Sequence, residues 1–164
     1  ESYRAMLDAS PELYDQVEMT VLMPPTQLDI APPGSVDLVV SFRSIHNWMA
    51  FGMQDDVMRA VYTALKPGGV FGVVEHRGIE GELQDPRVAT GYVTVAAMVE
   101  MAEKAGLELQ AASEINANPA DTKDYPDGVW TLPPRLRLGD VDQQKYLDIG
   151  ESDRFTLLFV KPAE

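Results

Sequence analysis

Residues 36–42 read Val-Asp-Leu-Val-Val-Ser-Phe, and residues 65–75 read Leu-Lys-Pro-Gly-Gly-Val-Phe-Gly-Val-Val-Glu. The first stretch predicts a buried strand, and the second predicts a tight Pro-Gly-Gly reversal that leads into another buried strand. Between them, residues 54–65 repeat apolar side chains at the spacing of an amphipathic helix. A strand, a helix and a second parallel strand form the repeating unit of doubly wound sheets. We therefore predict an α/β fold.

Functional residues are expected just after these two strands. In open α/β sheets, ligands bind beyond the carboxyl ends of the parallel strands. Residues 43–48 read Arg-Ser-Ile-His-Asn-Trp, and residues 75–77 read Glu-His-Arg. These two segments carry the first candidates for a site.

The rest of the chain is consistent with a single domain over residues 1–164. Further strands are expected at residues 17–22, 70–74, 107–115 and 155–161, and further helices at residues 2–7, from residue 10 and at residues 94–105. Residues 70–74 have almost no polar side chain, which is typical of a strand buried on both faces. Residues 116–154 form a long connection with one weak helical patch at 141–147. Loops of that length inside a domain are usually functional.

The charge of the chain limits its partners. The 164 residues include 13 Lys and Arg against 26 Asp and Glu, a formal net charge of −13. Such a surface repels phosphate backbones and anionic lipids, and no local cluster of Lys and Arg offsets it. We therefore expect neither nucleic acid nor a membrane as partner, and favour a small molecule or another protein.

The absence of cysteine excludes a disulfide framework, a thiolate metal site and a cysteine nucleophile. No apolar run approaches the roughly 18 residues that span a bilayer. The sequence begins at Glu1 without a signal peptide, so we expect a cytoplasmic protein, with the periplasm as the alternative.

The order of these elements resembles the C-terminal half of a class I methyltransferase. Residues 34–40 are similar to the fourth strand of that Rossmann-like fold, and residues 65–70 are similar to the turn before its fifth strand. The final antiparallel pair, joined by a long connection, resembles strands six and seven. The resemblance implies a mostly parallel sheet with an antiparallel last strand, and S-adenosylmethionine as the cofactor.

The tail resembles a bacterial family of predicted methyltransferases. Residues 113–119 read Ser-Glu-Ile-Asn-Ala-Asn-Pro, residues 128–134 read Gly-Val-Trp-Thr-Leu-Pro-Pro, and residues 149–154 read Ile-Gly-Glu-Ser-Asp-Arg. Residues 42–48 and 75–77 are similar to that family too. The resemblance covers essentially the whole chain and implies methyl transfer to a small molecule, without identifying that substrate.

One departure from the class concerns the cofactor. Class I methyltransferases hold S-adenosylmethionine mainly with a glycine-rich loop after the first strand and an acid after the second. The sequence contains no Gly-x-Gly, and the glycines at 68, 69 and 72 precede their strand, so they offer no helix N-terminus to a phosphate. We therefore expect a C-terminal portion that lacks most of the cofactor site and binds S-adenosylmethionine poorly alone. Ser41, Phe42 and Arg43 are the expected cofactor contacts, although Phe42 also suits packing.

Three ionisable residues are the catalytic candidates. His46 follows a strand and could act as a general base, or could simply hydrogen-bond a loop. Glu75 and His76 leave a buried strand, where polar side chains are costly unless they are used, or else that strand has reached solvent. Two histidines and one acid on separate segments are a weak indication of metal, so no metal is predicted.

Substrate contacts are expected from both strand ends and from the long connection. The candidates are Asn47, Trp48, Arg77, Asn116, Asn118, Lys123 and Trp130. Trp130 and the two prolines at 133 and 134 could fold residues 116–154 over the strand ends as a lid, or pack them into a rigid loop.

Two functions follow from these patterns. The first is S-adenosylmethionine-dependent methyl transfer, in which catalysis is mostly positioning. The second is a non-catalytic binding protein whose residues 116–154 form the recognition surface. In either case the strand at 36–41 would be an apolar edge, so we expect a second copy or an N-terminal segment to cover it.

Overall fold

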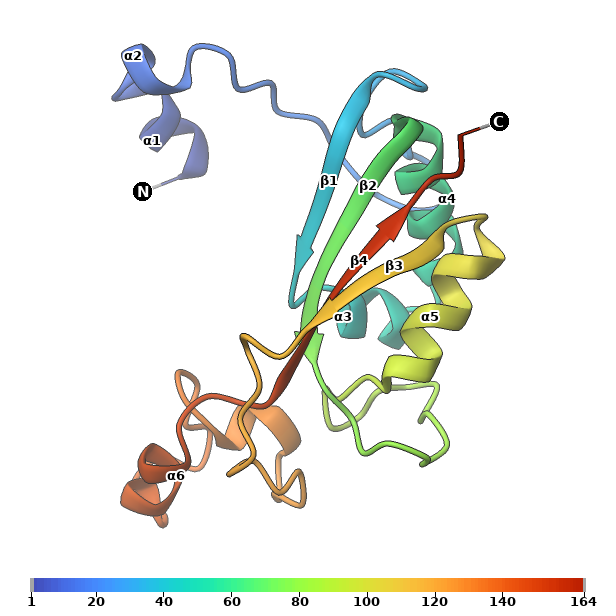
Figure 1. Ribbon diagram of the computed structural model, residues 1–164. Helices are drawn as coiled ribbons and strands as arrows, with labels where there is room; N and C mark the ends of the chain where they lie inside the picture. Colours follow the sequence, from blue (N-terminus) through green and yellow to red (C-terminus); the bar gives the residue numbers. More distant parts are fainter. Residues whose placement is uncertain (1, 164) are drawn as a thin grey trace.

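Four strands form one mixed sheet in the order β1-β2-β4-β3, in a computed structural model that describes residues 2–163 (Figure 1). β1 (Val36–Phe42) runs parallel to β2 (Leu65–His76). β4 (Arg154–Val160) lies antiparallel between β2 and β3 (Glu108–Ser113). Three strands thus share one direction and the last opposes them. The predicted α/β class, with its antiparallel last strand, is confirmed.

The Pro-Gly-Gly segment forms a bulge inside β2 rather than a separate turn. The register passes from the pair Val36–Leu65 to the pair Leu38–Val70, so residues 66–69 have no partners of their own in β1. Gly68 has a φ of 78°, a left-handed conformation that favours glycine. The bulge thus absorbs the change of direction where the chain enters the centre of the sheet.

Three helices cover one face of the sheet (Figure 1). α4 (Gln54–Ala64) and α5 (Val95–Lys104) confirm the predicted helices, and the Thr94 hydroxyl caps α5 by accepting from Ala97 N–H at 3.2 Å. α3 (Ile45–Ala50) was not predicted. Its six residues are too few to show a helical period in the sequence.

The remaining helices are short and lie away from the sheet in Figure 1. They are α1 (Tyr3–Asp8), α2 (Pro11–Tyr14), α6 (Gln143–Ile149) and the 3₁₀ turn Gly128–Thr131. The two N-terminal helices and the helical patch in the long connection were predicted and are confirmed. Within residues 2–163, each helix is too short or too polar to cross a membrane.

The strand predicted at residues 17–22 is wrong. This segment is extended but belongs to no strand, and Val17, Met19 and Val21 are exposed. The nearest regular pairing is a single bridge between Met23 and Gln27. Alternating apolar residues form a strand only where a neighbouring strand accepts their hydrogen bonds, and none of the described strands does so here.

The hydrophobic core lies on the helix side of the sheet. Phe71 and Val73 of β2 and Phe155 and Phe159 of β4 are almost completely buried there. The opposite face is open: the β1 side chains Leu38, Val40 and Phe42 are 56%, 50% and 63% exposed. Residues 70–74 are therefore buried on one face only, which corrects the prediction that both faces are covered, because all three packed helices lie on one side.

Candidate functional site

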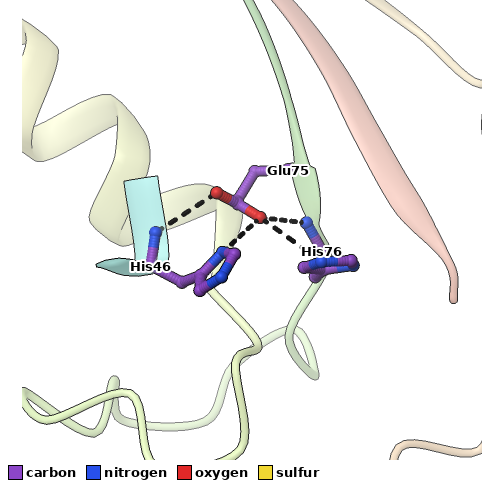
Figure 2. Close-up of side chains that lie close together, drawn as sticks. All are labelled: His46, Glu75 and His76. Carbon is purple, nitrogen blue, oxygen red and sulfur yellow. Dashed lines mark hydrogen bonds and ion pairs between the residues drawn. The ribbon is translucent and has the colours of Figure 1, made fainter. Parts of the chain in front are cut away.

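The site lies where β1 and β2 end side by side. The last residue of β1, Phe42, pairs with Val74, so α3, which begins soon after β1, starts next to the end of β2. This geometry brings His46 of α3 against Glu75 and His76 of β2 (Figure 2). The parallel pairing of two strands therefore assembles side chains that lie 29 residues apart in the sequence.

Glu75 is completely buried and accepts three hydrogen bonds. His46 approaches it twice, with its backbone N–H at 3.2 Å and its ring Nδ1 at 2.9 Å, and the backbone N–H of His76 donates at 2.8 Å (Figure 2). A carboxylate can only accept, so the Nδ1 of His46 carries the hydrogen in this contact. The other ring nitrogen, Nε2, is then the basic one.

His76 lies on the other side of the carboxylate. Its Nδ1 is 2.5 Å from the Ser152 hydroxyl oxygen, and its ring centroid is 5.3 Å from that of His46. Burial lowers the pKa of His76 from 6.5 to about 4, even though the nearby Glu75 acts in the opposite direction. The His76 ring is therefore uncharged at neutral pH.

A cavity of about 280 Å³ opens beside the two histidines. Its lining combines strand ends with the long connection: Phe42, Arg43, His46, His76, Val129, Trp130, Leu132, Pro133, Pro134, Arg135, Glu151 and Ser152. Trp130 presents its ring edge-on to His46, with centroids 6.1 Å apart, and Arg137 stacks on the same indole at 4.7 Å. Part of residues 116–154 thus lies at the strand ends, while Tyr125, Leu132 and Tyr146 pack the same connection into a hydrophobic cluster of its own, so the structure has features of both predicted arrangements.

A buried carboxylate fixes this long connection to the rest of the protein. Asp121, only 4% exposed, accepts from the Tyr92 hydroxyl at 2.9 Å, from the Asp153 N–H at 2.7 Å and from the Lys123 N–H at 3.0 Å. Burial and the adjacent Asp121 raise the pKa of Tyr92 far above its usual range, so it stays a donor. Asp121 thus joins the two ends of the connection to each other and to Tyr92.

A close backbone approach fixes the turn that carries Trp130. Val129 donates its N–H to the Thr90 carbonyl at 2.9 Å. The preceding Gly128 has a φ of 55°, and a Cβ placed there would come within 2.1 Å of that same carbonyl oxygen. Only glycine fits this position, which makes the turn a precise support for the cavity wall.

The structure brings some predicted site residues together at the cavity. His46, His76, Phe42, Arg43 and Trp130 line it, with Glu75 directly behind the histidines. Ser41 is buried near the end of β1 and does not line the cavity.

Other predicted substrate contacts lie away from this cavity. Trp48 packs against the core and Asn47 is exposed, with neither lining the cavity. Asn116 donates to the Thr156 hydroxyl at 2.7 Å, and Asn118 donates to the Ile149 carbonyl at 2.8 Å.

Two predicted cations are also used elsewhere. The Lys123 ammonium pairs with Asp153 at 3.0 Å, and Arg77 pairs with Glu114 at 2.5 Å. In this structure Lys123 joins the two ends of residues 116–154, and Arg77, whose Nε lies 3.6 Å from the Asp153 carboxylate, holds that segment near the end of β2. A substrate role for both side chains stays a prediction.

Ser152 and Arg135 belong to the cavity but were not predicted. Ser152 comes two residues before β4, and the first residue of β4, Arg154, pairs with His76 at the end of β2. An antiparallel neighbour necessarily begins where its partner ends, so this pairing could have indicated Ser152. No comparable signal indicates Arg135, which lies in irregular structure.

The same three ionisable residues are also a possible donor set for a metal ion. The ligand atoms of His46, Glu75 and His76 lie within 4.8 Å of one another. Imidazole and carboxylate groups suit zinc. However, Glu75 already accepts three hydrogen bonds, one of them from Nδ1 of His46, and an ion that took those positions would displace them.

Comparisons with known proteins address the fold. The sequence model of the methyltransferase domain family matches residues 3–73. The match covers less than half of the 164 residues, and the strand order with its antiparallel last strand agrees with it, as do the solved structures below. The chain has the class I methyltransferase fold.

Solved structures with this fold agree at low sequence identity. The [4+2]-cyclase SpnF superposes with a TM-score of 0.57 at 16% identity, covering 96% of this chain and 61% of its own. A protein from Galdieria sulphuraria described as a sarcosine dimethylglycine methyltransferase superposes with a TM-score of 0.51 at 15% identity, covering 82% of this chain and 57% of its own. A protein from Listeria monocytogenes described as an S-adenosylmethionine-dependent methyltransferase superposes with a TM-score of 0.50 at 16% identity, covering 98% of this chain and 76% of its own. No curated protein sequence matches the chain. It spans about three fifths of the length of the first two structures.

The methyltransferase fold implies S-adenosylmethionine, and one feature of this chain fits that cofactor. The Ser41 hydroxyl is buried at the carboxyl end of β1 and has no hydrogen-bond partner among the described residues. Unpaired buried polar groups are rare and point to a missing partner. The unpaired Ser41 hydroxyl therefore fits a cofactor contact, while the 164 residues contain no glycine-rich loop for the rest of the site. The next residue, Phe42, is exposed on the opposite face of the strand.

Proposed function

We propose that this chain forms the catalytic half of an S-adenosylmethionine-dependent methyltransferase that acts on a weakly acidic O–H or N–H group of a small molecule. The single observation that carries the proposal is the His46–Glu75 pair at the cavity wall, 2.9 Å apart and buried. Bound S-adenosylmethionine would supply an activated methyl group, with the Ser41 hydroxyl as one of its protein contacts. The remaining task of the protein is to hold the acceptor and remove its proton.

His46 is suited to that proton transfer. With its hydrogen on Nδ1 held by Glu75, the basic Nε2 can accept a proton from an acceptor group bound in the cavity. The imidazolium that forms is then stabilised by the carboxylate behind it, in a site where burial strengthens the attraction. Glu75 also fixes the ring orientation, because it binds the backbone N–H of the same histidine.

His76 has a different part in this scheme. Because its pKa is lowered to about 4, it is neutral at the pH at which His46 would act, and it is a poor proton donor. Its hydrogen bond to Ser152 fixes the ring at the cavity wall. It therefore serves to orient a bound acceptor through hydrogen bonding.

The fold alone does not determine the chemistry. SpnF, which shares it, is described as a [4+2]-cyclase, and one fold can host many activities. A non-catalytic binding protein is the rival function. It gives no reason for a buried carboxylate to fix the tautomer of a histidine at the cavity, so we do not favour it.

Kinetics of the full-length protein would test the proposal. S-adenosylhomocysteine formation is measured over a panel of phenols, hydroxy acids and amines, for the wild type, His46→Asn and the control Asn47→Ala. Loss of a general base should lower kcat by about 10²–10⁴-fold and leave the dissociation constant of S-adenosylmethionine within threefold. Loss of cofactor binding in parallel with activity, or unchanged turnover, would remove His46 from the reaction.

A further inference from the structure

We propose that the molecule bound in this cavity is a small oxyanion with a flat apolar body, whose negative group is held by Arg43 and Arg135. The inference rests on the proposed function, because it names the substrate class of the same site.

Positive side chains are scarce in this protein and most of them are engaged. Of the 13 Lys and Arg, six form ion pairs: Arg59, Lys66, Arg77, Lys104, Lys123 and Arg154. Three more lie over aromatic rings: Arg137, Lys145 and Lys161. Among the described residues, only four cations have neither kind of contact, and two of these, Arg43 and Arg135, line the same cavity.

These two arginines come from distant parts of the chain. Arg43 directly follows β1, whereas Arg135 belongs to the long connection that folds over the strand ends. Their convergence in a molecule with a net charge of −13 creates a local positive site against the overall field. Guanidinium groups bind carboxylates and phosphates through paired hydrogen bonds.

The backbone at Arg43 is itself unusual. Its φ is 53°, in the left-handed region that residues other than glycine rarely adopt, and its N–H donates to the Val74 carbonyl at 2.8 Å. Such conformations cost free energy and cluster at functional sites, where the position of a side chain repays the strain. Arg43 is exposed where it lines the cavity, and its strained backbone points to a role there.

The cavity offers no free carboxylate to neutralise the arginines. Glu151, the only acidic residue in its lining, pairs with Arg154. Glu75, behind the wall, is occupied by His46. A ligand anion would therefore meet two uncompensated positive charges.

The rest of the lining suits a flat apolar group. Trp130 and Pro133 are partly exposed and contribute aromatic and aliphatic surface to the same cavity as the arginines. The volume of about 280 Å³ lies at the lower end of small-molecule sites, which favours a compact ligand such as a one-ring acid. An anionic ring that also carried a hydroxyl or amino group would place that group within the same small cavity as His46.

The test is calorimetric titration of the full-length protein with benzoate, phenyl phosphate and the uncharged benzamide. We expect at least one of the two anions to bind at least tenfold more tightly than benzamide, and the stronger of them identifies carboxylate or phosphate as the preferred group. Arg43→Gln and Arg135→Gln should each weaken that anion about tenfold and leave benzamide unchanged. Arg87→Gln, which removes an exposed arginine outside the cavity, is the control and should have no effect.

Three results would overturn the proposal. They are benzamide binding as tightly as both anions, an equal effect of Arg87→Gln, and no binding of any of the three probes. Displacement of the anion by S-adenosylhomocysteine in simple competition would also overturn it, because the arginines would then belong to the cofactor site. These titrations do not require turnover. Anion binding can therefore be confirmed even if no methyl transfer is detected, so the two proposals are tested separately.

Discussion

The carboxylate of Glu75 lies 2.9 Å from Nδ1 of His46, and the same side chain accepts the backbone N–H of His46 at 3.2 Å. One acidic residue at the end of β2 therefore fixes both the start of α3 and the ring that α3 carries. The position and the tautomer of His46 are therefore set by one carboxylate. This double role leads to the first prediction.

Glu75→Gln should leave His46 in position but remove the negative charge that stabilises its protonated ring. The amide can still accept hydrogen bonds, but it is uncharged and can no longer stabilise an imidazolium, so we expect kcat to fall at least tenfold with little change in cofactor affinity. Steady-state kinetics of the full-length protein would measure this. Glu114→Gln, an exposed acid that pairs with Arg77, is the matched control. A loss of equal size in the control would show that the effect is not specific to the pair.

The stability of the fold should depend on pH through His76. Its pKa is 6.5 when unfolded and about 4 in the folded protein, so between these values the unfolded chain binds the extra proton and the folded chain does not. Stability therefore falls as the pH falls from about 6.5 to about 4, by up to about 3 kcal/mol, and is unaffected by this group at higher pH.

Urea unfolding at a series of pH values would measure that dependence. His76→Gln should flatten the curve over this interval, and His46→Asn serves as the comparison because it removes the other histidine. A His76→Gln curve with the slope of the wild type would mean that His76 is protonated as readily in the folded protein as in the unfolded chain.

Gly128→Ala should loosen the cavity wall. The new Cβ would meet the Thr90 carbonyl oxygen at 2.1 Å, and the backbone has a φ of 55°, so both contact and conformation oppose the change. We expect a loss of about 2 kcal/mol or more, with faster proteolysis within residues 116–154. Gly139→Ala is a sharp control, because its φ is 60° but no atom lies within 4 Å of the added Cβ. If both variants lose the same stability, the contact with Thr90 contributes nothing.

The sequence predicted the parallel β1–α4–β2 unit well because its pattern is local. Apolar runs and a helical period are visible within a dozen residues, and the structure contains the two strands and the helix that they predict. Residues 17–22 show the opposite case: their alternation suited a strand, but a strand depends on a partner that the pattern cannot reveal.

The sequence predicted only those parts of the candidate site that follow from the order and pairing of the strands. His46, Glu75 and His76 follow strand ends, and parallel pairing brings strand ends together, so their proximity could be expected. The cavity wall depends instead on the path of the 39 residues from 116 to 154. That path is set by single contacts such as Asp121 with Tyr92, which leave no periodic trace in the sequence.

The last prediction concerns the open face and edge of β1. Leu38, Val40 and Phe42 together expose an apolar stripe on β1, which pairs with another described strand on one side only, while the three helices packed on the sheet lie on its other face. Unpaired edges and apolar stripes recruit further chain, so residues 1–164 produced alone should self-associate. Sedimentation velocity over a range of concentrations would detect this, and Val40→Lys should shift the chain toward monomer because a charge interrupts the stripe. Leu83→Lys changes an equally apolar but fully exposed loop residue and should leave association unchanged. A wild-type chain that stays monomeric at every concentration would show that this edge needs no partner.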